Sequence, residues 1–193
     1  LNGFHCLYDA IDKQLDERPI DWYASGPLAV VLAIRNARHH NKANRIRTLY
    51  TYHAQESASP TSMQQYVLID FPAGDEGGDT FDVYLSWADL RDLLMMGRDQ
   101  SRLKQTTVEA IKKYICPDQF FAYASRFGLG EDKVFLNGVP LIVNAAATIV
   151  PLIKKHCGDD STESQFFADH FATISLANTR KPTINCSPFV LPE

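Results

Sequence analysis

The chain has 193 residues, of which 45% are hydrophobic and 22% charged, and its formal net charge is −4 at neutral pH. This composition is typical of a globular protein with enough apolar surface to form a core without disulfide or metal staples. The overall charge argues neither for nor against nucleic-acid binding. No apolar run is long enough for a transmembrane helix, and the first residues differ from a signal peptide. We therefore expect a cytoplasmic protein without a membrane segment.

A first helix is predicted for residues 4–17, where apolar residues recur at spacings of three and four along one face. Pro19 ends this pattern, because the residue before a proline avoids the helical region. His5 and Cys6 lie together on the predicted helix. They are residue types that can form a metal or nucleophilic pair, but the pattern favours a partly buried structural histidine.

The segment 25–49 begins as a very apolar run and becomes the most basic part of the chain. Ser25 and Gly26 suit a helix cap, and Pro27 suits the first helical position. The run 28–34 contains no polar residue, which predicts a helix that is buried on all sides. Its β-branched residues also fit a buried strand, but the pattern continues for several turns and favours the helix.

The predicted helix leaves the core at Arg35, which is followed by Asn36 and then by His39 and His40. An arginine and a histidine at the rim of a core form a partly desolvated site, where charge-assisted hydrogen bonds to a phosphate are stronger than on an open surface. Helix geometry places Arg35 and His39 on one face, with His40 about 140° round from Arg35. This junction is the candidate functional site.

The residues around the junction are unusually free of negative charge. No acidic residue lies between Asp21 and Glu56. The further basic residues in this window are Arg38, Lys42, Arg45 and Arg47. Such clustering indicates an anionic partner, and a solvated basic helix end is the alternative interpretation. The aromatic residues Trp22 and Tyr23, just before the segment, fit either core packing or stacking on an RNA base.

Two β-rich runs around a Gly/Asp-rich turn predict an antiparallel hairpin at about residues 64–86. Residues 133–138 fit either a second short hairpin or the start of a helix. Pro151 should kink or divide the helix that contains it. Further helices are predicted to begin at Ser86, at about Ser101, at Pro117, at Leu141 and at Asp160.

These elements predict a mainly α fold, a helical bundle with the β-hairpin inserted. Residues 1–180 would form a single domain, and residues 181–193 an extended C-terminal tail. The four cysteines are Cys6, Cys116, Cys157 and Cys186, and no two of them form a C-x-x-C pair. This spacing disfavours a zinc ribbon or a disulfide scaffold and predicts reduced, mostly buried thiols. We expect no metal and no cofactor.

The hexapeptide from Arg35 to His40, RNARHH, resembles the R-x(4–6)-H motif of the HEPN superfamily, in which a polar residue such as Asn36 usually follows the arginine. In that family the motif lies on a helix of a helical bundle. Many HEPN proteins are metal-independent endoribonucleases, often toxins or defence effectors, that act as dimers with two motifs facing a shared cleft. Others have lost catalysis and serve as binding or scaffolding domains.

The resemblance implies an endoribonuclease that cleaves single-stranded RNA through attack by the 2′-hydroxyl. His40, or else His39, would transfer the proton, Arg35 would hold the scissile phosphate, and Asn36 would orient one of them. The RNA backbone would be bound by Arg38, Lys42, Arg45 and Arg47. It also implies a homodimer and a toxin with an antitoxin partner.

Three other interpretations fit the same residues. The first is a non-catalytic helical module that binds an anionic ligand or a protein partner through the basic segment. The second is a metalloprotein built from His39, His40 and another histidine. In the third, Arg35 is a buried structural arginine paired with a carboxylate such as Asp21 or Asp169.

Overall fold

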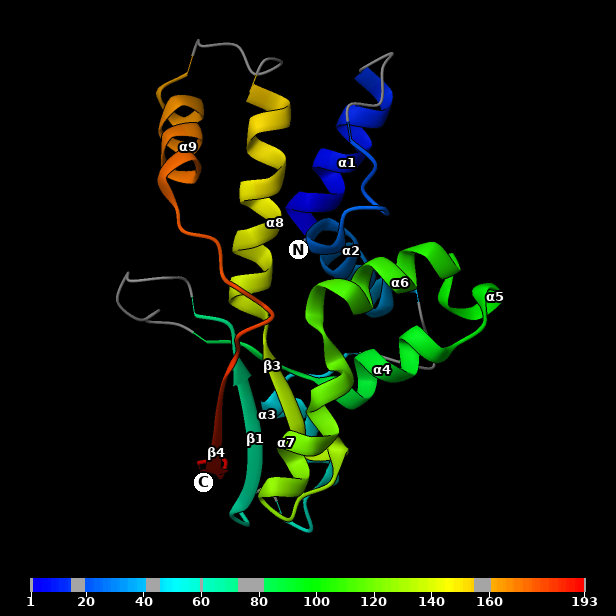
Figure 1. The fold of residues 1–193 in the computed structure, drawn as a ribbon, viewed down its shortest axis with the longest axis vertical. Coiled ribbons are helices and arrows are strands. Elements are labelled where there is room, and N and C mark those ends of the chain that lie inside the picture. Colours follow the sequence, from blue (N-terminus) through cyan, green and yellow to red (C-terminus); the bar gives the residue numbers. More distant parts are fainter. Residues whose placement is uncertain are drawn as a thin grey trace.

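The computed structural model describes residues 2–14, 20–40, 46–59, 61–72, 82–154 and 161–192. In this part of the chain the protein is mostly helical and contains a four-stranded mixed sheet (Figure 1). The helices are α1 (Asn2–Gln14), α2 (Gly26–His40), α3 (Leu49–Glu56), α4 (Trp87–Met95), α5 (Arg98–Ser101), α6 (Gln105–Ile115), α7 (Phe120–Arg126), α8 (Gly138–Ile153) and α9 (Thr162–Thr173). Short 3₁₀ turns are η1 (Pro117–Gln119) and η2 (Glu131–Lys133). The strands are β1 (Gln64–Asp70), β2 (Tyr84–Ser86), β3 (Val134–Asn137) and β4 (Thr183–Phe189).

Helix α2 is the buried centre of the helical part, as its apolar sequence predicts. Every residue from Leu28 to Ile34 is at most 2% exposed. The helix packs against α1, α6 and α8. Close packing requires a small residue at its start, because a Cβ on Gly26 would lie 2.6 Å from Cβ of Tyr114 on α6. The burial of α2 fixes where the chain emerges, at Arg35.

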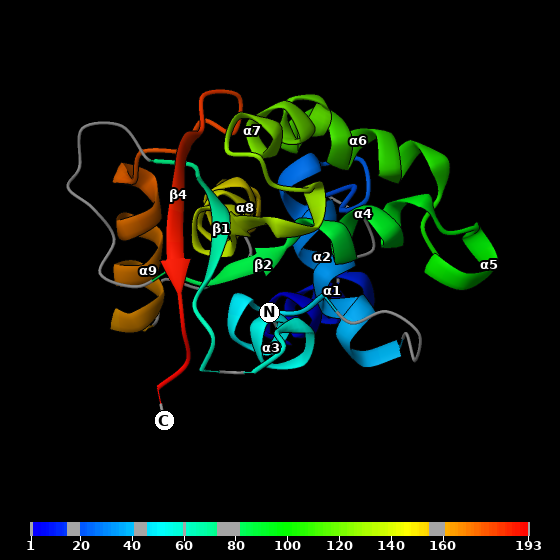
Figure 2. The same cartoon turned by 90° about the horizontal axis from the view of Figure 1, so that it is seen from below.

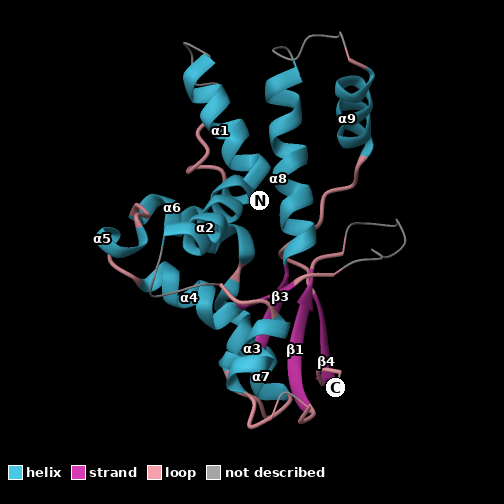
Figure 3. Ribbon diagram, turned by 180° about the vertical axis from the view of Figure 1, so that it is seen from behind, coloured by secondary structure: helices cyan, strands magenta, loops and turns pink. Residues whose placement is uncertain are grey.

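The predicted hairpin at residues 64–86 is wrong. The sheet order is β2-β3-β1-β4, so β3 lies between the two strands that were expected to pair. Strand β1 is parallel to β3 and antiparallel to β4, and β2 is antiparallel to β3. The molecule is thus an α/β arrangement and not a helical bundle with a hairpin (Figure 3). The turn at residues 74–79 lies outside the described residues.

The two faces of the sheet bury different sets of side chains, because successive residues of a strand point to opposite faces. On one face Tyr66 and Phe135 pack with Leu49 and Tyr52 of α3 in a small aromatic cluster. On the other face the side chains join the main core around α2. These are Val67, Ile69, Val134 and Leu136.

The segment predicted as an extended tail supplies the edge strand of the sheet. Strand β4 pairs with all of β1, from Gln64 opposite Phe189 to Asp70 opposite Thr183. Figure 2 shows β4 beside β1 at one side of the sheet. The linker between α9 and β4 is held by Asn144 of α8, whose side chain bonds both the N–H and the carbonyl of Ala177. Most of residues 181–193 thus belongs to the folded sheet.

Several local signals act as the sequence predicts. Ser86 caps α4 by accepting a hydrogen bond from the Asp89 N–H. Asn137 both ends β3 and caps α8, so the ambiguous segment 133–138 is a strand that leads directly into a helix.

Pro151 does not divide α8, which continues to Ile153. A proline so near the end of a helix removes a single interior hydrogen bond.

The thiols differ from the prediction of mostly buried cysteines. Cys6 is exposed, and Cys116 and Cys186 are partly exposed and free of disulfides. Cys157 lies outside the described residues.

Among the helices that the structure describes, none has the combination of length and hydrophobicity that a membrane crossing requires.

Candidate functional site

Arg35 and Asn36 stand side by side where α2 emerges from the core. The Nη1 of Arg35 donates a hydrogen bond to Oδ1 of Asn36 at 3.1 Å. Both residues are half-buried, and Ala37 after them is again buried. The guanidinium is thus held at the rim of the core, as the sequence predicts, with the amide of Asn36 as its neighbour.

The other residues of the predicted motif are only partly described. The backbone of Arg38, His39 and His40 continues α2 to its last residue, and their side chains lie outside the described part of the structure. Lys42 and Arg45 also lie outside it. The choice between His39 and His40 therefore stays a prediction.

Arg47, predicted to contact RNA, is bonded to carboxylates instead. Its Nε and Nη2 donate to the two oxygens of Asp89 at 2.8 and 2.7 Å, and its Nη1 donates to Glu56 at 2.6 Å. The guanidinium also lies over the ring of Tyr52, 4.6 Å from the centroid. The hydrogen bond to Asp89 raises the pKa of Arg47, although partial burial opposes the shift. Arg47 joins the segment after α2 to α4, and its charge is paired with two carboxylates.

A pocket of about 230 Å³ opens beside Asn36. His5 of α1, Tyr23 and Arg102 line it together with Asn36, and none of its described lining residues is acidic. The Nε2 of His5 lies 3.6 Å from Oδ2 of Asp9, one turn further along α1. Imidazole, phenol, amide and guanidinium groups can all donate hydrogen bonds to a negatively charged oxygen.

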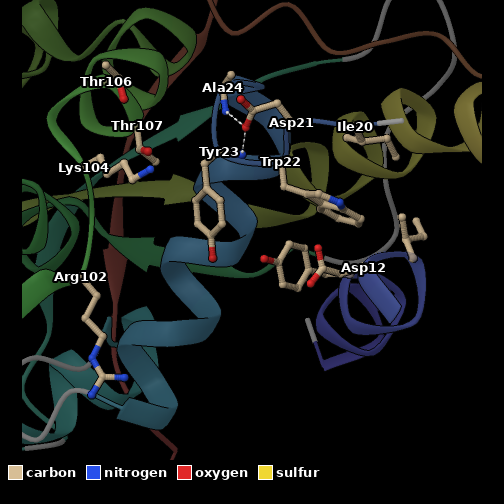
Figure 4. Close-up of a pocket in the computed structure, with 12 residues that line it drawn as sticks. Asp12, Ile20, Asp21, Trp22, Tyr23, Ala24, Arg102, Lys104, Thr106 and Thr107 are labelled. Atoms are coloured by element: carbon tan, nitrogen blue, oxygen red, sulfur yellow. Dashed lines mark hydrogen bonds between the residues drawn. The ribbon is translucent and has the colours of Figure 1, made fainter. Parts of the chain in front are cut away.

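A larger cleft of about 580 Å³ adjoins this pocket, since Tyr23 and Arg102 line both. Figure 4 shows Tyr23 in the middle of the cleft, between the segment that carries Arg102 and Lys104 and the helix that carries Asp12. Tyr23 is positioned by a tight turn in which Oδ1 of Asp21 accepts the N–H groups of Tyr23 and Ala24, each at 3.1 Å.

Burial raises the pKa of the Tyr23 phenol, and the nearby Tyr8 adds to the shift. A hydrogen bond with Asn36 and the charge of Arg35 oppose it. The phenol therefore keeps its proton at neutral pH and remains a hydrogen-bond donor. Tyr23 connects the predicted Arg35–Asn36 site to the cleft.

Sequence reasoning anticipated only part of this site. It identified Arg35 and Asn36, and it named base stacking as one role for Tyr23. It treated His5 as a structural residue of the first helix. No pattern in the sequence pointed to Arg102. It follows the short helix α5 and has a left-handed backbone conformation, with φ of 59°. Only the tertiary fold brings it next to Asn36.

Two of the alternative interpretations concern a metal site and a carboxylate partner for Arg35. Within the described residues no group of three or more His, Cys, Asp or Glu side chains is arranged to hold a metal ion. The proposed metal site used His39 and His40, whose side chains are not among them. Asp21, considered as a partner of Arg35, bonds the backbone of its own turn.

Comparisons with known proteins add no identification. No protein-family model, no curated protein and no solved structure matches this chain.

Proposed function

We propose that the protein binds single-stranded RNA, with phosphate groups held at the Arg35–Asn36 junction and in the pocket beside it. The observation that carries this proposal is the composition of that pocket. His5, Tyr23, Asn36 and Arg102 line it, and its described lining includes no carboxylate. A partly buried site with several donors and no carboxylate in its described lining favours an anion.

The chemistry of each group fits a phosphate oxygen. A guanidinium binds phosphate through two parallel hydrogen bonds, and it keeps its charge at any physiological pH. Asn36 turns its carbonyl oxygen to Arg35. Its amide nitrogen is then the part that donates to Tyr23 or to a ligand. The basic residues Arg38, Lys42 and Arg45 follow directly in sequence and would continue along the RNA backbone.

Metal-independent RNA cleavage is the second candidate, favoured by the resemblance of the segment from Arg35 to His40 to the HEPN motif. His40, or else His39, would take the proton from the 2′-hydroxyl, and Arg35 would stabilise the charge that develops on the phosphate. We favour RNA binding over RNA cleavage, because the α/β arrangement differs from the helical bundle that the resemblance implies. The homodimer and the antitoxin partner that go with cleavage stay predictions.

Fluorescence anisotropy with a labelled single-stranded RNA tests the binding proposal. The wild-type protein should bind at low salt and lose affinity steeply as KCl is raised, since bound cations are released from the phosphates. Arg102→Ala should weaken binding, whereas Arg126→Ala, which removes an equal charge at the exposed end of α7, should not. Equal affinities for these two variants, or no binding by the wild type at low salt, would sink the proposal.

The same RNA, incubated with protein in EDTA and separated on a gel, tests cleavage. Cleavage by the wild type that is lost in His40→Ala and kept in His39→Ala would assign the proton transfer to His40. Binding without any cleavage would leave the module non-catalytic.

A further inference from the structure

The larger cleft shares Tyr23 and Arg102 with the RNA-binding pocket, and the RNA-binding proposal does not use the rest of its lining. It lies between α1, the turn at residues 20–24 and the segment that joins α5 to α6 (Figure 4). Its volume of about 580 Å³ falls inside the range of about 300–1,000 Å³ that is usual for sites of small organic ligands.

One side of the cleft is positively charged and lies at the start of a helix. Arg102 and Lys104 are exposed there, and within the described part of the chain neither forms an ion pair. Lys104 is the N-cap residue of α6, an 11-residue helix that has no side-chain cap and no acidic residue in its first turn. The N–H groups and the dipole at such a helix start favour a phosphate.

Thr107 gives an independent indication of a ligand. It lines the cleft and is only 2% exposed. Buried hydroxyls normally have a hydrogen-bond partner, and Thr148 of α8, for example, donates back to the carbonyl of Asn144 at 2.7 Å. Among the described residues no hydrogen bond involves the hydroxyl of Thr107, and this oxygen is not one of the fully buried atoms that lack a partner. It therefore reaches the cleft, where it can donate a hydrogen bond to a phosphate oxygen at the start of α6.

The opposite side of the cleft is aromatic and acidic. Tyr8 of α1 packs there edge to face with Tyr23, which lies in the middle of the cleft, and the ring centroids are 6.2 Å apart. Asp12 and Asp21 also line this side. Carboxylates repel a phosphate, but they accept hydrogen bonds from sugar hydroxyls, and a tyrosine ring offers a surface to a flat heterocycle.

We propose that this cleft binds a ribonucleoside 5′-monophosphate, with the phosphate at Arg102, Lys104 and Thr107 and the sugar toward Asp12 and Asp21. The ligand is identified by the separation of charge across the cleft, positive at the start of α6 and negative on α1 and the adjacent turn. The proposal does not depend on RNA cleavage or on the Arg35–Asn36 junction. The same chemistry has two sources, a free nucleotide and the phosphorylated 5′ end of an RNA.

Isothermal titration of the full chain with adenosine 5′-monophosphate tests the proposal, with adenosine and inorganic phosphate as comparison ligands. The nucleotide should bind at least roughly tenfold more tightly than adenosine, because hydrogen bonds to a charged group contribute most of the recognition. Adenosine binding as tightly as the nucleotide, or no nucleotide binding at millimolar concentration, overturns it.

Matched variants locate the phosphate. Lys104→Ala and Thr107→Val should each weaken nucleotide binding by about fivefold or more, whereas Lys112→Ala on the exposed side of α6 should leave it unchanged. Thr107→Ser keeps the hydroxyl and should retain most of the affinity. Circular dichroism confirms that each variant is folded. Wild-type affinity in both Lys104→Ala and Thr107→Val contradicts the assignment.

Short RNAs with and without a 5′-phosphate separate the two sources. If the ligand is an RNA end, the phosphorylated RNA binds more tightly, and adenosine 5′-monophosphate competes for the difference. If it is a free nucleotide, the two RNAs bind equally and the nucleotide binds beside them. Loss of RNA binding with nucleotide binding intact would count against the RNA proposal alone.

Discussion

The guanidinium of Arg47 touches two carboxylates, whereas that of Arg102 lines a cleft and forms no ion pair within the described residues. Both arginines lie in connecting segments, and the sequence around Arg47 is the more basic. Arg47 nevertheless became a structural residue, because α4 brings Asp89 to it. A basic run therefore does not by itself locate a binding surface, since carboxylates from distant segments decide which cations remain available.

The largest expected effect is on the free energy of unfolding, when Arg47 loses its partner Asp89. Asp89→Ala removes the 9% exposed carboxylate that accepts both Nε and Nη2 of Arg47, and it also leaves the Arg47 N–H without its acceptor. We expect a loss of about 3 kcal/mol in the free energy of unfolding, measured by urea denaturation, because a partly buried charge loses its partner. Asp92→Ala, which removes an exposed carboxylate of the same helix, should change stability by less than about 0.5 kcal/mol.

The second prediction concerns the other arginine. Arg102→Ala should weaken RNA binding about fivefold at low salt and should reduce the slope of log affinity against log salt by about 0.7, as expected for the loss of one phosphate contact to a single strand. The free energy of unfolding should stay within about 0.5 kcal/mol, because Arg102 is exposed. The measurements are an anisotropy titration at several KCl concentrations and a urea melt. An unchanged salt slope would remove Arg102 from the RNA site.

A smaller effect is expected at the outer partner of Arg47. Glu56→Ala breaks a 2.6 Å ion pair whose carboxylate side chain is 47% exposed. Because water replaces such a partner, the loss should be about 0.5 kcal/mol by the same urea measurement. A loss as large as that of Asp89→Ala would show that the two carboxylates act as one unit.

The smallest effect is expected at the buried hydroxyl of the cleft. Thr107→Val keeps the shape of a 2% exposed side chain and removes a hydroxyl that has no partner among the described residues. The free energy of unfolding should stay within about 0.5 kcal/mol or increase, since no protein hydrogen bond is lost. A loss of more than about 1 kcal/mol in the ligand-free protein would show that the hydroxyl has a structural role.

The helices of this protein were largely predictable, because their signals are local. The apolar run of α2, the Ser86 cap of α4 and the Asn137 cap of α8 each depend on residues within a few positions of one another. The emergence of Arg35 from the core followed from the same run. The position of Arg35 and Asn36 at the end of the buried run was therefore predictable, whereas their role and that of the histidines stay predictions.

The sheet and the rest of the site were decided by tertiary structure. Alternation in a strand shows which side chains share a face, but it does not name the neighbouring strand, and for this reason β3 could separate β1 from β2 and the tail could become β4. The pairing of Arg47 with Asp89 and the approach of Arg102 to Asn36 join segments far apart in the sequence. Helices form from residues that are close together in the sequence, so the sequence alone determined them. Strand partners and ion pairs form between distant segments, so only the tertiary structure determined which charges remain open to a ligand.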